Sequence, residues 1–394
     1  MRILLVCHQF LPRYSSGTEV LTRDTGIELS RRGHEVHVLT CDPRPGTRFA
    51  GVEVEEYEYA GLQVHSLRLP GGQSEREQLE WEYLNPIAAD QVVVYAQSLQ
   101  PDTVHIFHLL NFSASVIGPL QSLEVPLVFT ATDFWSFCVR GNLTKPSGEL
   151  CRGPDGSNCL ECRRVDEWFP PRILRSKSGR RRYFKRVAAQ ARAERPDELK
   201  KVMLARVVLA RTQEMHRRIS QADAILAPTR LTLELLIENG FERDRVRLSP
   251  YGVDSSQFRA ARERHLATLD REPAHLRIGF IGTLAEHKGL HVLIDAFRRL
   301  GDPPGVTLRI CGGLGDFPDY SRSVLPRSHS ILESTSPAAS VTARWQRSWS
   351  ESTSSWSPRP GMRMLRWSST RRWRQASRWS PPASAGSRSS LSMV

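Results

Sequence analysis

The sequence predicts an α/β protein with two doubly wound parallel sheets, of which the second is incomplete. Its first 41 residues alternate a short apolar strand, a helix and a second apolar strand, which is typical of a parallel β-α-β unit. Similar apolar runs recur up to residue 249, and a new strand–helix–strand pattern begins at residue 276. The 394 residues suffice for two domains, because single cores rarely exceed about 250 residues.

The N-terminal domain, residues 1–253, is expected to contain most of the strands. Its opening places a strand at Ile3–Cys7, a helix at Glu19–Arg31 that ends before Gly33, and a strand at Glu35–Cys41. Two hairpin-like strands and four short apolar strands of the buried parallel kind follow, at Val52–Tyr57, Leu62–Leu67, Thr103–Phe107, Pro126–Thr130, Asp223–Pro228 and Val246–Ser249.

Residues 138–220 interrupt this order. They combine a loop that contains cysteine and glycine with a basic helical stretch and lack alternating strands, so we expect an insertion within the first domain. The sheet pattern then resumes, with a helix at Arg230–Asn239. A partial second domain, residues 254–325, repeats strand, helix and strand at Leu276–Gly282, Lys288–Leu300 and Val306–Cys311.

The last segment, residues 326–394, is rich in Ser, Arg and Trp and has no apolar periodicity. It contains six of the nine tryptophans, whereas natural disordered tails are poor in aromatic residues. Such Trp-Ser-Arg runs are typical of a GC-rich gene translated out of frame. We therefore interpret the segment as an out-of-frame, disordered tail, with a genuine basic low-complexity tail as the alternative.

The net charge of +13 describes two segments rather than the whole fold. The excess of Lys and Arg lies in residues 163–218 and 326–394. Charge is the only feature that suggests nucleic-acid binding, and no recognised module accompanies it, so we expect no nucleic-acid partner. The N-terminus lacks a signal-peptide core, and no apolar run approaches the roughly 20 residues of a membrane span, which predicts a cytoplasmic protein.

Three separated motifs carry a resemblance to a known family. In chain order they are His8-Gln9-Phe10-Leu11-Pro12 through Ser16-Gly17-Thr18-Glu19, then Pro250-Tyr251-Gly252-Val253-Asp254, then Gly279-Phe280-Ile281-Gly282 through His287-Lys288-Gly289. In this order and spacing they resemble family 4 of the glycosyltransferases with the GT-B fold. The resemblance implies two Rossmann-like domains and the transfer of a sugar, with retention, from a nucleotide-sugar donor to an acceptor hydroxyl.

The resemblance also implies a donor site. Gly17 and Thr18 belong to a loop that leads into a helix, whose free N–H groups and dipole attract phosphate, and a tight turn is the alternative role of Gly17. Lys288, together with Gly282 and His287, would stabilise the departing nucleotide of a UDP- or GDP-sugar, with a solvated lysine as the alternative. Such chemistry requires no catalytic metal.

The sequence departs from the family at three places. Thr132 stands where the family often has a histidine, and Thr283 stands where it often has an arginine, which leaves Lys288 without that partner. The Glu-x7-Glu motif of the family is expected beyond residue 326, where Glu333 and Glu351 are the only acidic residues and do not fit its spacing. We therefore expect the chain as written to be catalytically impaired.

Polar residues that follow the short strands are candidates for the acceptor site, because open α/β sheets bind ligands at their carboxyl edge. His108 is a better candidate for acceptor contact than His105, and a structural role is the alternative for both. Asp133 is predicted to orient an acceptor hydroxyl or to cap the next helix. Lys288, His108 and Asp133 are the predicted catalytic residues.

Four of the seven cysteines are clustered as Cys138-x12-Cys151-x7-Cys159-x2-Cys162. In a cytosolic chain, four thiolates that include one Cys-x-x-Cys pair predict a tetrahedral structural zinc site. An iron–sulfur cluster and free thiols are the alternatives. The remaining cysteines fall in apolar strands and are expected to be inert; they are Cys7, Cys41 and Cys311.

The basic run Arg163–Arg186 leaves two interpretations open. In the first interpretation, the run contacts an anionic membrane surface that carries a lipid-linked acceptor, which would place the protein at the inner face of the membrane. In the second, it forms a solvated helix face. The leading hypothesis is a sugar transferase that acts on a polysaccharide, cell-envelope glycan or glycolipid. Its alternative is a non-catalytic remnant of the same fold that binds a partner through the cysteine cluster or the basic surface.

Overall fold

The computed structural model describes most of the chain up to residue 324. The described ranges are 1–42, 51–72, 74–155, 157–163, 177–192, 200–266, 276–301, 306–315 and 317–324. The segment 326–394 lies outside them, so its interpretation as an out-of-frame tail stays a prediction.

The N-terminal part is built on one eight-stranded sheet with the order β3-β4-β2-β1-β5-β6-β7-β8. The strands are β1 (Arg2–Cys7), β2 (Glu35–Cys41), β3 (Glu53–Tyr59), β4 (Leu62–Arg68), β5 (Thr103–Ile106), β6 (Leu127–Thr130), β7 (Ala224–Ala227) and β8 (Val246–Leu248). All neighbours pair in parallel except the β3–β4 hairpin. The predicted doubly wound sheet and its antiparallel hairpin are thus confirmed.

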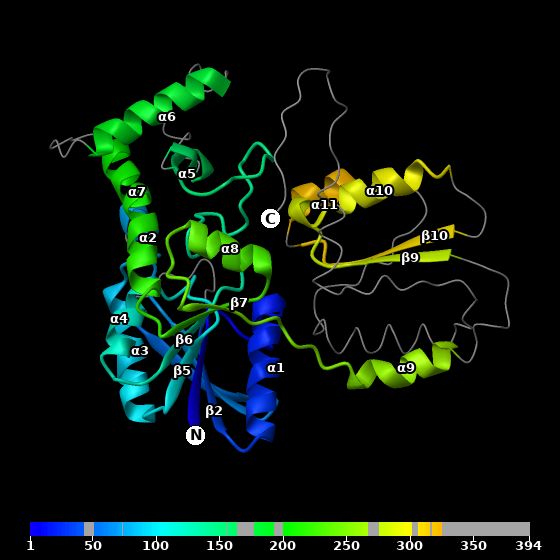
Figure 1. Cartoon of the computed structure of the whole chain (residues 1–394), viewed down its shortest axis with the longest axis horizontal. Helices are drawn as coiled ribbons and strands as arrows, with labels where there is room; N and C mark the ends of the chain where they lie inside the picture. Colours follow the sequence, from blue (N-terminus) through cyan, green and yellow to red (C-terminus); the bar gives the residue numbers. More distant parts are fainter. Residues whose placement is uncertain are drawn as a thin grey trace, which may run out of the picture. The chain divides into compact units, whose positions relative to one another are not determined.

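The helices of the N-terminal part cover the two faces of this sheet or lie in the insertion. They are α1 (Gly17–Arg31), α2 (Glu75–Glu80), α3 (Pro86–Leu99), α4 (Ile117–Gln121), α5 (Ser157–Cys162), α6 (Lys177–Arg192), α7 (Lys200–Ile219) and α8 (Arg230–Glu238), with α9 (Ser256–Leu266) after the last strand. The larger core packs the strands against α3, α4 and α7, and a second core packs the other face against α1. Figure 1 shows α3 and α4 along one side of the sheet and α1 along the other.

The predicted insertion is the crossover between β6 and β7. These strands are parallel neighbours, so the residues between them form one connection that contains α5, α6 and α7. The described part of this connection has an isolated bridge between Thr144 and Leu150 and its own small apolar core, which includes Leu160, Val187 and Val202. The insertion therefore buries apolar surface of its own and is not only a loop.

The described residues of the C-terminal part form one strand–helix–strand unit with a further helix after it. Parallel strands β9 (Leu276–Ile281) and β10 (Val306–Cys311) pack against α10 (Leu290–Arg298) and α11 (Pro318–Val324). The helix predicted to begin at Lys288 begins two residues later, because Gly289 has a φ of 75° and separates it from a short 3-10 turn, Glu286–Lys288. One such unit is an incomplete doubly wound domain, as predicted.

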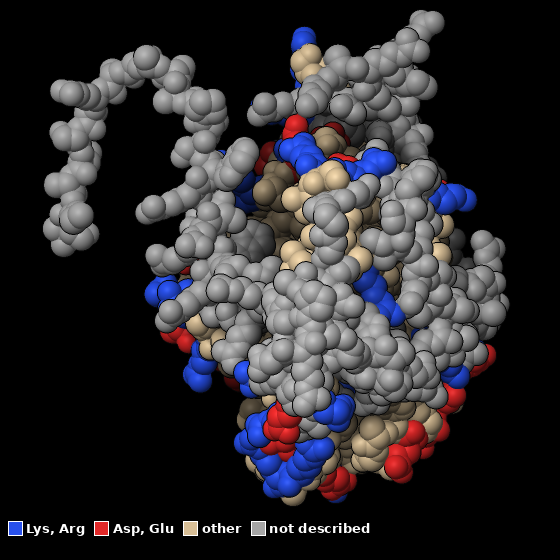
Figure 2. Space-filling view, turned by 90° about the vertical axis from the view of Figure 1, so that its right-hand side faces the viewer, with Lys and Arg blue, Asp and Glu red and all other residues tan. Residues whose placement is uncertain are grey.

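The helices and the surface charges can be compared with the two interpretations of the basic run, which are membrane contact and a solvated helix face. Among the described residues, none of the helices combines the length and apolar character needed to cross a membrane. On the face shown in Figure 2, basic and acidic side chains of the described residues lie beside one another. The basic run 163–186 is described only at Arg163 and from residue 177 onward.

Candidate active site

Polar side chains gather at the carboxyl edge of the central strands. His8 directly follows β1, His108 follows β5 by two residues, and Asp133 follows β6 by three. Because β1, β5 and β6 are adjacent parallel strands, their carboxyl ends lie at one edge of the sheet. The predicted residues His108 and Asp133 are therefore brought together, and His8 joins them.

His108 is held in one tautomer. The backbone N–H of Leu110 donates to Nδ1 of His108 at 3.1 Å, so this nitrogen is the acceptor. Nε2 then carries the proton and donates to Oδ2 of Asp133 at 3.2 Å. The His108 ring is 5% exposed and also lies against Trp135, with ring centroids 5.1 Å apart. Both ring nitrogens of His108 are thus occupied by the protein.

Asp133 is the more accessible member of this pair. Its side chain is 45% exposed, and its second oxygen, Oδ1, accepts the backbone N–H of Trp135 at 2.7 Å. Partial burial raises the pKa of Asp133, but the hydrogen bonds from His108 and Trp135 outweigh it, so the pKa lies below its usual value. At neutral pH, Asp133 is an oriented carboxylate that a ligand can reach.

His8 and Glu19 extend the cluster into the interior. The His8 ring lies 4.5 Å from that of His108, centroid to centroid, and its Nε2 lies 3.6 Å from Oε1 of Glu19. Burial and the neighbouring His108 lower the pKa of His8 to about 3, so the ring is neutral at pH 7. Glu19 is fully buried; its Oε2 accepts from Ser16, and its Oε1 has no hydrogen-bond partner among the described residues.

The predicted phosphate-binding residues Gly17 and Thr18 begin α1. The side chain of the N-cap residue, Ser16, accepts no hydrogen bond from the backbone N–H groups of the helix; its hydroxyl donates to the side chain of Glu19. The N–H groups of the first turn are therefore not capped by that side chain. A Cβ atom added at Gly17 would meet nothing within 4 Å, so the fold itself does not demand a glycine there.

The predicted donor-site residues of the C-terminal part share one loop. Gly282 directly follows β9, and His287 and Lys288 lie in the 3-10 turn before α10. Both side chains of that turn are exposed, and partial burial together with the charge of Lys288 lowers the pKa of His287. The predicted residues Gly282, His287 and Lys288 thus lie in the single loop between β9 and α10.

His105 does not belong to the site. Its Nε2 contacts the hydroxyl of Thr130 at 2.7 Å, its ring stacks on Phe107, and burial lowers its pKa to about 4. These contacts identify it as a structural residue, which was one of the two interpretations. Thr132, in the position where the family often has a histidine, donates its hydroxyl to the carbonyl of Phe107 at 3.2 Å.

Arg211 links the insertion to the site. This α7 residue is 1% exposed; its Nε donates to Glu82 at 2.5 Å and its Nη2 donates to the carbonyl of Trp135 at 2.9 Å. Its guanidinium also lies 5.4 Å from the centre of the Trp135 ring. Burial lowers the pKa of Arg211 to about 10, which still leaves it charged at neutral pH.

Sequence reasoning assigns no role to His8, Glu19, Trp135 or Arg211. His8 could have been predicted from the sequence by the same criterion as His108, because it also follows a buried strand. Arg211 also has a signal, since it is a lone charge after four consecutive apolar residues on a helix. The burial of Glu19 has no such signal, because it depends on how α1 packs against the sheet.

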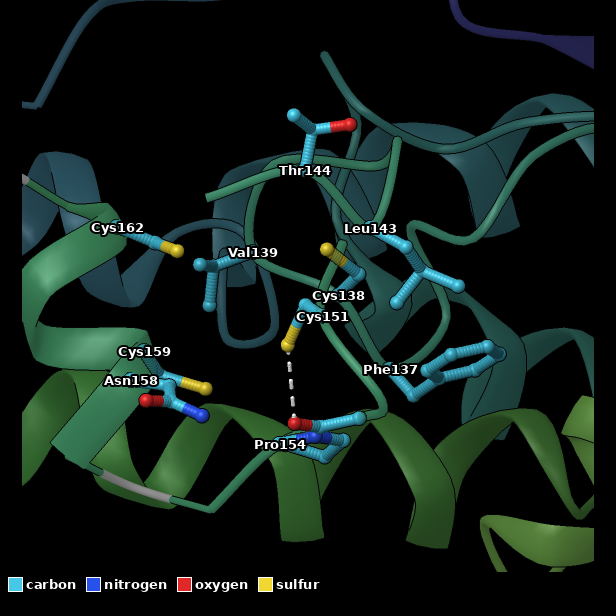
Figure 3. Close-up of a pocket in the computed structure, with 11 residues that line it drawn as sticks. Phe137, Cys138, Val139, Leu143, Thr144, Cys151, Pro154, Asn158, Cys159 and Cys162 are labelled. Carbon is cyan, nitrogen blue, oxygen red and sulfur yellow. Dashed lines mark hydrogen bonds between the residues drawn. The ribbon is translucent and has the colours of Figure 1, made fainter. Parts of the chain in front are cut away.

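The four clustered cysteines line one small cavity in the insertion (Figure 3). They are Cys138, Cys151, Cys159 and Cys162, the set predicted to bind metal. As the side chains stand, no group of three or more His, Cys, Asp or Glu residues in the described ranges is arranged to hold a metal ion. The structure thus brings the four residues together around one cavity.

Solved structures that resemble this chain include three with low sequence identity. The α,α-trehalose-phosphate synthase (UDP-forming) from Burkholderia xenovorans in complex with glucose-6-phosphate matches with a TM-score of 0.50 and 11% identity, over 88% of this chain and 77% of that one. The catalytic domain of starch synthase IV from Arabidopsis thaliana, bound to ADP and acarbose, matches with a TM-score of 0.46 and 13% identity, over 86% of this chain and 75% of that one. HepE from Anabaena in complex with UDP and glucose matches with a TM-score of 0.42 and 15% identity, over 85% of this chain and 70% of that one.

At these identities the likeness concerns the fold alone, and the fold is the predicted GT-B fold with two Rossmann-like domains. A search of the curated proteins gives no match. The family profile described as the glycosyl transferase 4-like domain matches residues 16–252, which is more than half of the chain. The protein therefore belongs to the glycosyl transferase 4-like family.

Proposed function

We propose that this protein is a retaining glycosyltransferase that moves a sugar from a UDP- or GDP-sugar to a hydroxyl of a polysaccharide, a cell-envelope glycan or a glycolipid. The observation that carries the proposal is the oriented Asp133 carboxylate beside His108, at the ligand-binding edge of a sheet that lies within the family match. Domain boundaries at residues 253 and 325 are part of the proposal.

On the acceptor side, Asp133 contacts the substrate and His108 positions Asp133. The carboxylate is reachable and accepts the hydrogen bond of the acceptor hydroxyl, whereas the buried His108 uses both ring nitrogens within the protein. His8 keeps the environment of His108 neutral, because its own ring stays uncharged at pH 7. This arrangement orients a hydroxyl and increases its tendency to attack the donor sugar.

On the donor side, two groups of residues bind the diphosphate without a catalytic metal. The backbone N–H groups of Gly17 and Thr18 present the positive end of the α1 dipole to an anion. The exposed Lys288, with Gly282 and His287 in the same loop, supplies a positive charge that stabilises the departing nucleotide.

Catalysis by the chain as written is weak in this proposal. The segment after residue 326 contains only Glu333 and Glu351 as acids, so no Glu-x7-Glu pair is available to hold the donor sugar and ribose. Sugar transfer at an ordinary enzymatic rate by the purified chain would contradict this part. Nucleotide binding without transfer is the expected result.

Calorimetric titration of the full chain with UDP and with GDP tests the proposal. We expect one of them to bind, and Lys288→Ala to weaken its binding about tenfold, because one charge-assisted contact contributes about 1.4 kcal/mol. Arg298→Ala is the matched control: it removes one exposed positive charge from the other end of the same segment and should leave the affinity unchanged.

Two outcomes count against the proposal. If neither nucleotide binds, the non-catalytic remnant becomes the better interpretation. If Arg298→Ala weakens binding as much as Lys288→Ala, the attraction is general electrostatics rather than a phosphate site.

Contact with an anionic membrane is the proposed location of a lipid-linked acceptor. The support is α6, whose sequence KSGRRRYFKRVAAQAR contains basic and aromatic residues and no acid. Vesicles that contain anionic lipid should pellet the protein at low salt and release it at high salt. If the protein stays in the supernatant at low salt, α6 is a solvated helix.

A further inference from the structure

Four cysteines from two segments of the insertion surround one cavity. Cys138 and Cys151 belong to the loop between β6 and α5, and Cys159 and Cys162 belong to α5. Figure 3 shows the four sulfur atoms around the same space. The cavity measures about 10 Å³, which is room for about one water-sized atom.

Local backbone structure positions both pairs. Residues three apart on a helix lie on the same face, which explains why Cys159 and Cys162 both reach the cavity. The backbone N–H of Cys151 donates to the carbonyl of Leu143 at 2.7 Å, and the carbonyl of Cys138 accepts the N–H of Gly141 at 3.1 Å. The backbone thus places two cysteines on each side of the cavity, and the sulfur positions depend only on side-chain rotation.

One of the four cysteines makes a hydrogen bond to the backbone. The thiol of Cys151 donates a hydrogen bond to the carbonyl of Gly153, with 3.2 Å between sulfur and oxygen. The described side chains do not form a metal-binding group as they stand, so metal binding requires the cysteine side chains to rotate.

A buried positive group adjoins the cluster. Arg211 lies near enough to Cys138 and Cys159 to interact electrostatically with their charged forms. Its Nη1 is buried and has no hydrogen-bond partner among the described residues. Four thiolates around one divalent cation carry a net charge of −2, so a neighbouring guanidinium offsets part of that charge, and its free N–H can donate to a sulfur atom.

We propose that Cys138, Cys151, Cys159 and Cys162 bind one structural Zn²⁺ in a tetrahedral thiolate site. Binding forms four S–Zn bonds and releases the four thiol protons to solvent, with no change of oxidation state. A single ion matches the space of about 10 Å³ between the cysteines.

The site would brace the loop that carries Asp133 and Trp135. Cys138 is five residues from Asp133, and its backbone N–H donates to the carbonyl of Phe134 at 2.7 Å. Zinc would therefore connect α5 to the end of β6, in addition to the link that Arg211 makes. This role does not depend on which sugar or nucleotide the protein binds.

Metal analysis of the full chain, purified without a histidine tag from zinc-supplemented cells, tests the proposal. We expect about one zinc per chain by mass spectrometry. Cys159→Ser and Cys138→Ser should each lose most of the metal. Cys311→Ser is the matched control, because this cysteine lies in β10 outside the cluster, and it should keep about one zinc.

Cobalt substitution keeps the test decisive even if the cysteine variants fail to fold. Wild-type protein that is stripped of metal and loaded with Co²⁺ should show the strong visible and charge-transfer absorption of a tetrahedral thiolate site. Protein with less than about a tenth of a zinc per chain and no such spectrum would overturn the proposal. Stoichiometric iron, or a disulfide between any two of the four cysteines in freshly purified protein, would overturn it as well.

Discussion

The N-terminal and C-terminal parts of this protein use the same strand–helix–strand pattern with very different results. In the N-terminal part, the central strands of an eight-stranded sheet are packed on both faces, and a strand residue such as Ile106 is fully buried. In the C-terminal part, two described strands are covered by α10 and α11, and Ile281, Val292 and Phe317 are about half exposed.

This difference shows that a parallel apolar strand gains its stability from neighbours on both faces. Parallel sheets are stable when helices cover both sides, and two strands alone are marginal. Burial also changes the chemistry of polar residues, because His8 and His105 are forced to stay neutral whereas Lys288 and His287 lie at the surface. The two parts should therefore respond differently to the same perturbation.

The largest expected effect is a loss of stability as the pH falls from 7 to 5. Burial and the neighbouring His108 lower the pKa of His8 to about 3. Burial alone lowers the pKa of His105 to about 4. In the unfolded chain both titrate near pH 6.5, so below that pH the unfolded state binds protons that the folded state does not. Each histidine then reduces the free energy of unfolding by about 2 kcal/mol at pH 5.

Urea unfolding at several pH values, followed by circular dichroism, measures this effect. His105→Gln should remove about half of the loss. His287→Gln is the control from the C-terminal part and should leave the pH dependence nearly unchanged, because that side chain is exposed. Equal effects of the two substitutions would contradict the contrast between buried and exposed histidines.

The next largest effect on stability is expected when a buried isoleucine is replaced, and an exposed isoleucine serves as its control. Ile106 is the last residue of β5 and fully buried, whereas Ile281 is the last residue of β9 and 50% exposed. Ile106→Ala should lower the free energy of unfolding by about 3 kcal/mol, because it leaves a cavity. Ile281→Ala should lower it by less than about 1 kcal/mol. If Ile281→Ala costs as much as Ile106→Ala, the C-terminal strands are covered by a partner or by further chain.

A pair of arginines extends the comparison to charged groups. Arg211→Ala should lower the free energy of unfolding by about 2 kcal/mol, because Glu82 and the Trp135 carbonyl each lose a buried partner. Arg322→Ala removes an ion pair between two exposed side chains and should change it by less than about 0.5 kcal/mol. Tryptophan fluorescence reports the first change directly, because Arg211 lies over the Trp135 ring. An unaltered spectrum and unaltered stability in Arg211→Ala would refute the proposed link between insertion and site.

The sequence predicts the strands well because each is a short apolar run with a clear end. All predicted strands of both parts are present within a few residues of their expected bounds. The helix α3 is not predicted, although Asn85 caps it and Pro86 occupies its first turn. Its apolar residues form two short runs on either side of Asp90 and Gln91 rather than an obvious helical stripe, and only packing against the sheet shows which of them are buried.

The site was predictable where it depends on strand ends and unpredictable where it depends on tertiary packing. His108 and Asp133 meet because the topology makes β5 and β6 neighbours. The assignment of His108 to substrate contact is revised in our proposal, because its burial and both of its hydrogen bonds come from the folded loops. The approach of Arg211 to Trp135 joins residues 76 positions apart, and no local pattern encodes it.

The smallest effect on stability offers the sharpest test of the phosphate site. Gly17→Ala should leave the free energy of unfolding within about 0.5 kcal/mol, because the new methyl group meets no atom and alanine favours a helix. Gly289→Ala should lower it by about 1 kcal/mol, because Gly289 has a φ of 75° that other residues rarely adopt.

Nucleotide titration of Gly17→Ala then separates binding from folding. If a diphosphate lies against the first turn of α1, the methyl group displaces it and the affinity falls about tenfold in a protein of unchanged stability. No loss of packing can explain that result, since the fold leaves the space beside Gly17 open. Unchanged affinity would mean that the first turn of α1 is not a phosphate site, and it would leave Lys288 and its loop as the remaining proposed diphosphate contact.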